Sequence, residues 1–217
     1  MSHPLWPLYD LRLRTDRLEL FLPDETQLID LCRLARSGIH PPDEMPFAIP
    51  WSRKPSPRFE REFIQFHWGA RAAWSPQDWV LELAVSLDGR IVGAQGLVAR
   101  DFAVMRAVAT GSWLGSAYQR QGIGTEMRAA VLALAFDRLG AEIAETEAFV
   151  DNPASAGVSR ALGYLPNGTG RLAPDGFRRE TERFRMTVAE WRTRPRSTVS
   201  VEGLDACLEL FGVASSE

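Results

Sequence analysis

Stretches in which hydrophobic and polar residues alternate recur along the chain, and this period of two predicts β-strands. They cover residues 13–23, 79–87, 91–100, 106–115, 142–150 and 178–188. The turn sequence DGR, residues 88–90, separates the second from the third and predicts a β-hairpin.

Four other stretches have hydrophobic residues at every third or fourth position, which predicts helices. They cover residues 25–38, 58–73, 151–164 and the stretch that follows Gly122 and runs to Gly140. Asp24 is a suitable N-cap for the first helix, and Gly163 is suited to end the fourth. Strands linked by a hairpin precede alternating strands and helices. We therefore expect an α/β fold with a mixed sheet and helices on both faces.

The proline-rich segment 39–57 fits neither pattern and is predicted to be a long loop, a kind of segment that is often functional. Residues 197–212 predict a further strand and a helical turn. We expect residues 1–195 to form the main domain and residues 196–217 an extension that packs on it or on a partner subunit. Either arrangement covers an edge strand, and on this ground we expect a homo-oligomer.

The composition narrows the classes of function. The 217 residues carry a net charge of −3 and are 45% hydrophobic, which suits one globular domain. The sequence has no apolar run of membrane-spanning length and no secretion signal, so we expect a cytoplasmic protein without a membrane partner. The dispersed arginines form no basic stripe for nucleic acid. The only cysteines, Cys32 and Cys207, lack metal-ligand spacing, and we expect no metal.

The sequence QRQGIGTEM, residues 119–127, stands at the start of a predicted helix. The simplest interpretation is a tight turn that needs glycine. A dinucleotide fingerprint fits poorly because its third glycine is Met127, and the lysine of a Walker loop is absent. A fourth interpretation is a phosphate site, because the first amides of a helix have no partner within it and its dipole favours anions.

Gln119 to Gly124, followed by Thr125 and Glu126, resembles the acyl-CoA-binding motif of the GNAT superfamily of N-acyltransferases. LRTDRLEL near the start, and DNPAS with ALGY further on, resemble its RimJ/RimL-type branch, so that the resemblance covers residues 13–190. MPFAIPWSR, GSWLG, GTEMRAAVL and FVDNPAS also resemble a mycobacterial GNAT protein regarded as a succinyltransferase.

The resemblance implies transfer of an acetyl or succinyl group from acyl-CoA to a primary amine, on a small molecule or a protein, by direct attack. It implies a mostly antiparallel sheet in which the fourth and fifth strands splay around the pantetheine arm. The backbone of Trp113, Leu114 and Gly115 would pair with that arm, and the Leu114 amide would stabilise the oxyanion. The diphosphate would be held by the amides of Gln121, Gly122, Ile123, Gly124 and Thr125, with charge from Arg120.

Two polar residues match the branch's Asn-x-x-Ser segment. Asn152 could bond the pantetheine amide, or it could only cap the helix that begins at Pro153. Ser155 would lie near the departing sulfur and protonate it, unless it is only a turn serine. Many GNAT enzymes place a tyrosine acid where this chain has Ser159, so a tyrosine mechanism is excluded there. Ser155, Ser159 or water would take its place.

The attacking amine must lose a proton, and a carboxylate acting through water could accept it. The candidates are Glu147, Asp175 and Glu180, although each could be an ordinary surface acid. His40 and Arg53 are candidates for binding a succinyl carboxylate. Two other hypotheses stay open: a non-catalytic acyl-CoA sensor or interaction module, and an NAD-binding domain.

Overall fold

The computed structural model describes residues 3–195 and 198–213 and contains a single nine-stranded sheet. The strand order is β7-β8-β6-β5-β4-β3-β2-β1-β9, and only the pair β5–β6 is parallel. The prediction of an α/β fold with a mostly antiparallel sheet is confirmed. The strands are β1 Arg12–Arg14, β2 Leu18–Phe21, β3 Trp79–Leu87, β4 Arg90–Ala99, β5 Ala107–Leu114, β6 Ile143–Phe149, β7 Leu165–Leu172, β8 Arg179–Thr187 and β9 Ser200–Glu202.

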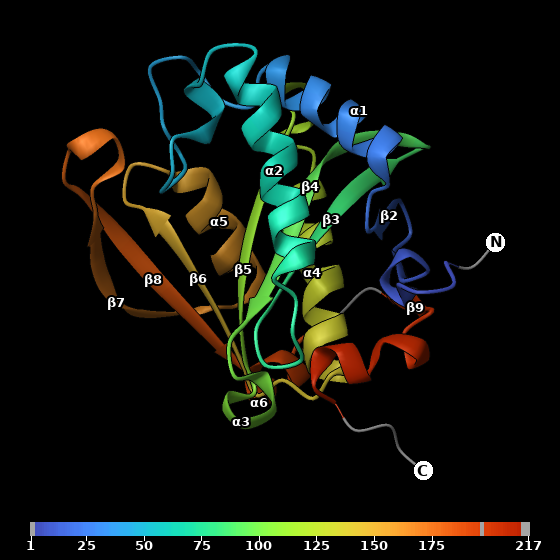
Figure 1. Ribbon diagram of the computed structural model, residues 1–217. Helices are drawn as coiled ribbons and strands as arrows, with labels where there is room; N and C mark the ends of the chain where they lie inside the picture. Colours follow the sequence, from blue (N-terminus) through green and yellow to red (C-terminus); the bar gives the residue numbers. More distant parts are fainter. Residues whose placement is uncertain (1–2, 196–197, 214–217) are drawn as a thin grey trace.

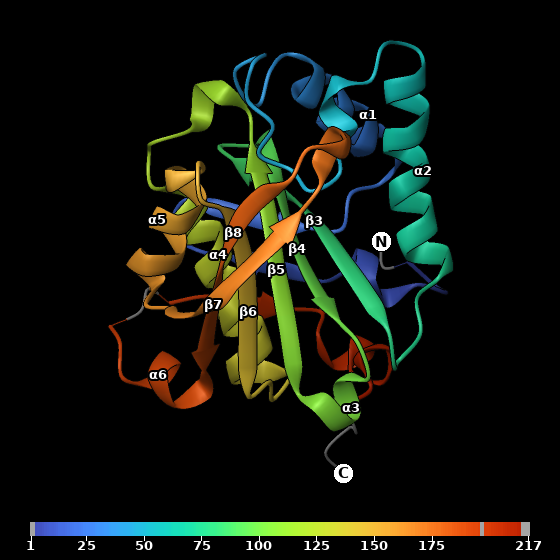
Figure 2. The same ribbon diagram turned by 90° about the vertical axis from the view of Figure 1, so that its left-hand side faces the viewer.

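Helices cover both faces of the sheet (Figures 1 and 2). On one face lie α1 (Glu25–Arg36) and α2 (Arg58–Ala72); on the other lie α4 (Ile123–Ala133) and α5 (Pro153–Leu162). A π-helical turn, Leu134–Arg138, continues α4. The shorter elements are α3 Phe102–Met105, α6 Val188–Arg192 and the 3-10 turns Pro7–Tyr9, Trp51–Arg53, Ser116–Tyr118, Pro174–Gly176, Asp205–Cys207 and Glu209–Phe211. No helix of residues 3–195 and 198–213 has the length and apolar character needed to span a membrane.

Two strand predictions need correction. The predicted strand 13–23 is two strands, β1 and β2, because the chain turns at Thr15, whose hydroxyl accepts a hydrogen bond from the Leu18 amide (2.9 Å). Strand β7 was not predicted. It lies at the edge of the sheet and five of its first six residues are exposed, so it carries no hydrophobic alternation.

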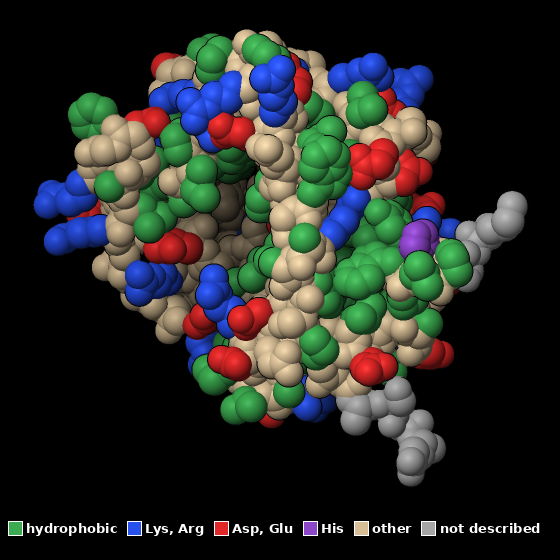
Figure 3. All heavy atoms as spheres, viewed as in Figure 1, with side chains coloured by type: hydrophobic (Ala, Val, Ile, Leu, Met, Phe, Trp, Pro, Cys, Tyr) green, Lys and Arg blue, Asp and Glu red, His purple; other side chains and the backbone are tan. Residues whose placement is uncertain are grey.

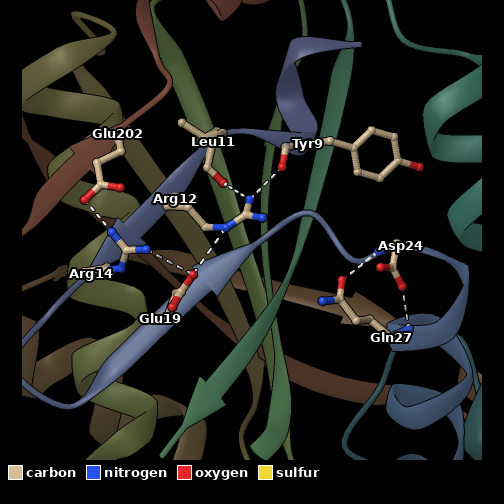
Figure 4. A network of polar contacts seen from close by, with 8 residues as sticks. All are labelled: Tyr9, Leu11, Arg12, Arg14, Glu19, Asp24, Gln27 and Glu202. Atoms are coloured by element: carbon tan, nitrogen blue, oxygen red, sulfur yellow. Dashed lines mark hydrogen bonds and ion pairs between the residues drawn. The ribbon is translucent and has the colours of Figure 1, made fainter. Parts of the chain in front are cut away.

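The C-terminal segment belongs to the same sheet and core. Strand β9 pairs with β1, and Arg14 forms ion pairs with Glu202 on β9 and with Glu19 on β2 (Figure 4). Phe211 is 0% exposed and packs against Trp79, with ring centroids 5.0 Å apart. The extension predicted over residues 196–217 includes 196–197 and 214–217, which lie outside the described residues.

This packing predicts that Phe211→Ala destabilises the main fold. Removing a fully buried phenylalanine costs about 3–5 kcal/mol, and here the loss falls on the aromatic cluster with Trp74 and Trp79. Chemical denaturation measures it, with Glu209→Ala, an exposed neighbour, as control. Equal stability of the two variants would contradict the assignment of this segment to the core.

The sheet opens between its two parallel strands (Figure 1). Residues Ala107–Ala109 of β5 pair with Ile143–Glu145 of β6, and the paired register ends there although both strands continue. The hydroxyl of Thr146 still reaches the Thr110 carbonyl (3.2 Å). Beyond it the strands diverge, as predicted, and α4 and α5 begin shortly after their ends. We call the space between the diverging ends the β5–β6 gap.

Candidate active site

The backbone of β5 presents polar groups to the β5–β6 gap. Successive residues of a strand direct these groups to opposite sides. The Gly115 amide donates to the Val92 carbonyl of β4 (3.0 Å), so the backbone groups of Leu114 and Ser112 face away from β4, toward the gap. The Leu114 carbonyl already accepts a bond from the Gln119 amide group (3.0 Å). The predicted role of the Leu114 amide is therefore compatible with its direction.

The side chain of Trp113 lies on the face of the sheet that α1 and α2 cover. Its ring packs against Trp51 (5.8 Å between centroids) and Phe63 (6.5 Å). The side chain is half-buried and packs against the hydrophobic cluster on this face.

The glycine turn lies open at the end of the gap. Gln121 and Gly122 are exposed, and Gly122 has a φ of 79° that favours glycine. Among residues 3–195 and 198–213, no acceptor is bonded to the amides of Gln121, Gly122, Ile123 and Gly124. The amide of Thr125 is bonded to the Gly122 carbonyl (3.1 Å) and is the least free of the five predicted donors.

Two arginines lie at this turn. Arg120 is exposed, with a left-handed φ of 58°. Arg17, which the sequence analysis missed, donates from Nη1 to the Gln121 carbonyl (3.3 Å) and pairs with Glu126 (2.5 Å). Because Arg17 is far from the turn in sequence, the local motif contains no signal for it. The turn therefore combines free amides, a helix N-terminus and two cations, which suits a diphosphate.

The start of α5 borders the other side of the gap. The Asn152 side chain accepts a bond from the Ser155 amide (3.1 Å), so the predicted helix cap is confirmed. Ser155 is half-buried. The hydroxyl of Ser159, by contrast, is 0% exposed, donates to the Ser155 carbonyl (3.2 Å) and accepts from Arg128 (2.9 Å). Both of these bonds occupy Ser159, which leaves Ser155 as the more accessible of the two serines.

A carboxylate that the sequence analysis missed lies on the α2 face of the sheet. Glu82 on β3 extends over Gly96 on β4, where an added Cβ would lie 2.5 Å from its Oε1 atom. Gly96 in turn pairs with Gly111 on β5, and a Cβ added at Gly111 would have no atom within 4 Å. Figure 3 shows the surface hollowed beside α2, on the side toward β6. Desolvation raises the pKa of Glu82 from 4.5 to about 7. Its sequence signal is a lone acid between Leu81 and Leu83.

A cavity of about 270 Å³ lies at the open end of the gap, between the loop 39–57, the turn after β6 and the β7–β8 connection. The structure brings three predicted residues together in its wall: Arg53, Asp175 and Asn152. The wall comprises Asp43, Glu44, Met45, Pro46, Arg53, Asp151, Asn152, Pro174, Asp175, Phe177 and Arg179. His40 is not part of it, because its ring bonds Ser52 (2.7 Å) and the Pro41 carbonyl (2.7 Å).

All three carboxylates predicted as proton acceptors have arginine partners. Asp175 pairs with Arg53 (3.1 Å), and Glu180 pairs with Arg171 (3.1 Å). Glu147 pairs with Arg183 (3.3 Å) and also accepts a bond from the Thr181 hydroxyl. Each of these three carboxylates is therefore engaged in an ion pair. Glu82 has no ion pair within residues 3–195 and 198–213, and in this respect it is better suited to accept a proton.

Solved structures share this fold. RimJ of Mycobacterium smegmatis, solved in complex with CoA-disulfide, is 19% identical, covers 88% of this chain and 92% of its own, and gives a TM-score of 0.65. A GCN5-related N-acetyltransferase from Brucella melitensis is 21% identical, with coverages of 83% and 80% and a TM-score of 0.67. RimL, a ribosomal L7/L12 alpha-N-protein acetyltransferase solved with coenzyme A, is 17% identical, with coverages of 80% and 95% and a TM-score of 0.64.

The family comparison agrees with the motif and with the fold. The model of the acetyltransferase (GNAT) domain matches residues 17–165, more than half of the chain. This range contains the glycine turn, the β5–β6 gap and the start of α5. The chain therefore belongs to the GNAT acetyltransferase family.

Proposed function

We propose that this protein is an acyl-CoA-dependent N-acyltransferase that transfers an acetyl or succinyl group to a primary amine. The observation that supports it most is the β5–β6 gap, which opens beside the exposed turn at the N-terminus of α4. In this proposal the diphosphate binds to the amides of Gln121 to Gly124, and the pantetheine arm follows β5 into the gap. The thioester supplies an activated acyl carbon when it is bound.

The chain's own groups then position and activate the reactants. The Leu114 amide, which faces the gap, donates to the thioester carbonyl oxygen and stabilises the charge that develops on it. Glu82 lies on the face of the sheet that α2 covers. From there it takes a proton from the amine, either directly or through water. A carboxylate with a pKa of about 7 is ionised for a large part of the time at neutral pH and is still basic enough for this task. The amine attacks directly, and no acyl-enzyme forms.

The acyl donor and the acceptor are the finer parts of the proposal. A succinyl group would carry a carboxylate, for which Arg53 and Arg179 in the cavity wall are suitable partners. The exposed acids Asp43 and Glu44 in the same wall favour a cationic acceptor. A small amine meets this requirement, and so does a protein N-terminus, the kind of acceptor on which RimL acts as an alpha-N-protein acetyltransferase.

Steady-state assays with acetyl-CoA and succinyl-CoA, over a panel of peptide and small-molecule amines, test the function. The expected result is release of free CoA thiol together with an acylated amine of the matching mass. Binding of CoA thioesters without turnover on any amine would instead support the sensor hypothesis. Protection from heat by nicotinamide cofactors, and none by CoA, would support the NAD-binding hypothesis.

A further inference from the structure

A buried arginine spans the underside of the β5–β6 gap. Arg128 on α4 is only 3% exposed, and its Nη1 and Nη2 atoms donate to Ser159 on α5 (2.9 Å) and to Ser112 on β5 (3.3 Å). Its side chain thus joins the helix that begins beside β6 to the strand on the other side of the gap. No carboxylate of residues 3–195 and 198–213 lies within ion-pair distance of it.

This cation is incompletely satisfied. The Nε atom of Arg128 has no hydrogen-bond partner in the described part of the chain. Burial raises the pKa of Tyr164, and the charge of Arg128, which lies close to this hydroxyl, opposes that shift. Burying a charge without a counter-ion costs several kcal/mol, so an anion that arrives near this group is stabilised strongly.

Ser112 connects the cation to the gap. Its side chain is half-buried, its backbone groups face the gap, and its oxygen accepts the bond from Arg128. Among the residues described, none accepts a hydrogen bond from the Ser112 hydroxyl, so this hydroxyl is free to donate to a ligand. A hydroxyl whose oxygen is bonded to a cation is a stronger donor, because the charge polarises its O–H bond.

We propose that the Ser112 hydroxyl, polarised by Arg128, donates a hydrogen bond to the sulfur that leaves the acyl group. This inference rests on the proposed function. As the amine nitrogen bonds to the acyl carbon, the carbon–sulfur bond breaks and sulfur keeps the electron pair as a thiolate. The attacking amine is neutral, and the excess proton that its nitrogen carries after bonding to the acyl carbon passes to Glu82, so no proton is required from Ser112. Arg128 acts as a positioning residue, and Ser112 is the catalytic group, in place of the tyrosine that many GNAT enzymes carry at the position of Ser159.

The direct test measures the pKa of the thiol in bound CoA. The complex is titrated with pH, and the ultraviolet absorbance of the thiolate gives the fraction that is ionised. A thiol has a pKa of about 8.5 in water, and a nearby cation lowers it. We expect the wild-type complex to titrate at least ~1 pH unit below free CoA. Ser112→Ala and Arg128→Met should return the value to that of free CoA, and Arg128→Lys should retain part of the shift.

Kinetics and a competing serine sharpen the test. Ser112→Ala should lower kcat about 100-fold while the Kd for CoA stays within about twofold. Ser155→Ala separates this proposal from the alternative in which Ser155 serves the sulfur. If Ser155→Ala removes the shift and Ser112→Ala does not, the proposal is wrong. CoA that binds with an unshifted thiol also overturns it and leaves the proposed function intact, whereas failure to bind CoA overturns both. Arg128→Met should unfold at a temperature no lower than that of the wild-type protein, because methionine replaces a buried charge that has no counter-ion.

Discussion

Replacing Glu82 by glutamine is expected to lower kcat/KM for acyl transfer about 100- to 1,000-fold at pH 7, since it removes the proton acceptor and preserves the shape of the side chain. In the wild-type protein kcat/KM should rise about tenfold per pH unit below pH 7 and level off above it. The sign follows from the chemistry, because only the ionised carboxylate accepts a proton and desolvation places its pKa at about 7. In Glu82→Gln, kcat/KM should no longer rise with pH in the range below pH 7.

The same substitution should not damage the fold. The folded protein holds the Glu82 proton up to pH about 7, whereas the unfolded chain loses it near 4.5, so stability decreases as pH rises through this window. Glutamine avoids the loss. Glu82→Gln should therefore be more stable than wild type at pH 8 by about 2 kcal/mol, after a discount for partial exposure. Glu145→Gln, an exposed strand glutamate, serves as control. A pH profile of Glu82→Gln that matches wild type would exclude Glu82 as the base.

Gly124→Asp is expected to weaken CoA binding at least ~100-fold in calorimetric titration. It places a carboxylate beside the proposed diphosphate, and two like charges ~4 Å apart near a protein surface repel by about 4 kcal/mol. The fold should tolerate the change, because an added Cβ would lie 3.5 Å from Val158 Cγ2 and 3.8 Å from Leu114 Cδ1. An acid in the first turn of a helix also favours the helix dipole.

Gly124→Asn is the matched control, with the same shape and no charge. It should lose only a small part of the affinity. If the aspartate and asparagine variants bind CoA equally well, the diphosphate does not lie at this turn, and the assignment of the free amides to phosphate binding fails. The difference should shrink as salt concentration rises, since salt screens exposed charges.

The sequence predicts those parts of the fold in which local pattern and burial agree. The hairpin of β3 and β4 is buried over most of its length, and its turn residues are clear, so its strands were predicted within one residue. Strand β7 has Pro166 and Gly168 and lies exposed at an edge, where pairing with β8 alone makes it a strand. The turn at Thr15 interrupts a run that reads as one strand.

The candidate site likewise contains one part that the local sequence predicts and other parts that it does not. The glycine turn is contiguous in sequence, and the free amides follow from the start of a helix, so the motif alone predicts this local geometry; its role in phosphate binding stays a prediction. The proposed roles of Glu82 and Arg128 depend on neighbours that are distant in sequence, so spacing does not predict them. Glu82 is an acid within an apolar strand, and the glycines opposite it on β4 and β5 leave space beside its carboxylate. Arg128 is an arginine within an apolar helix, and it meets Ser159 only because α4 and α5 pack together.

The central claim is that the β5–β6 gap and the turn at the start of α4 bind one CoA molecule. A crystal structure of the protein with CoA tests it most directly. We predict the diphosphate against the amides of Gln121 to Gly124, and the pantetheine arm paired with β5 so that its sulfur lies near Ser112. CoA bound at any other surface, with the gap filled by the protein's own side chains, would contradict this account.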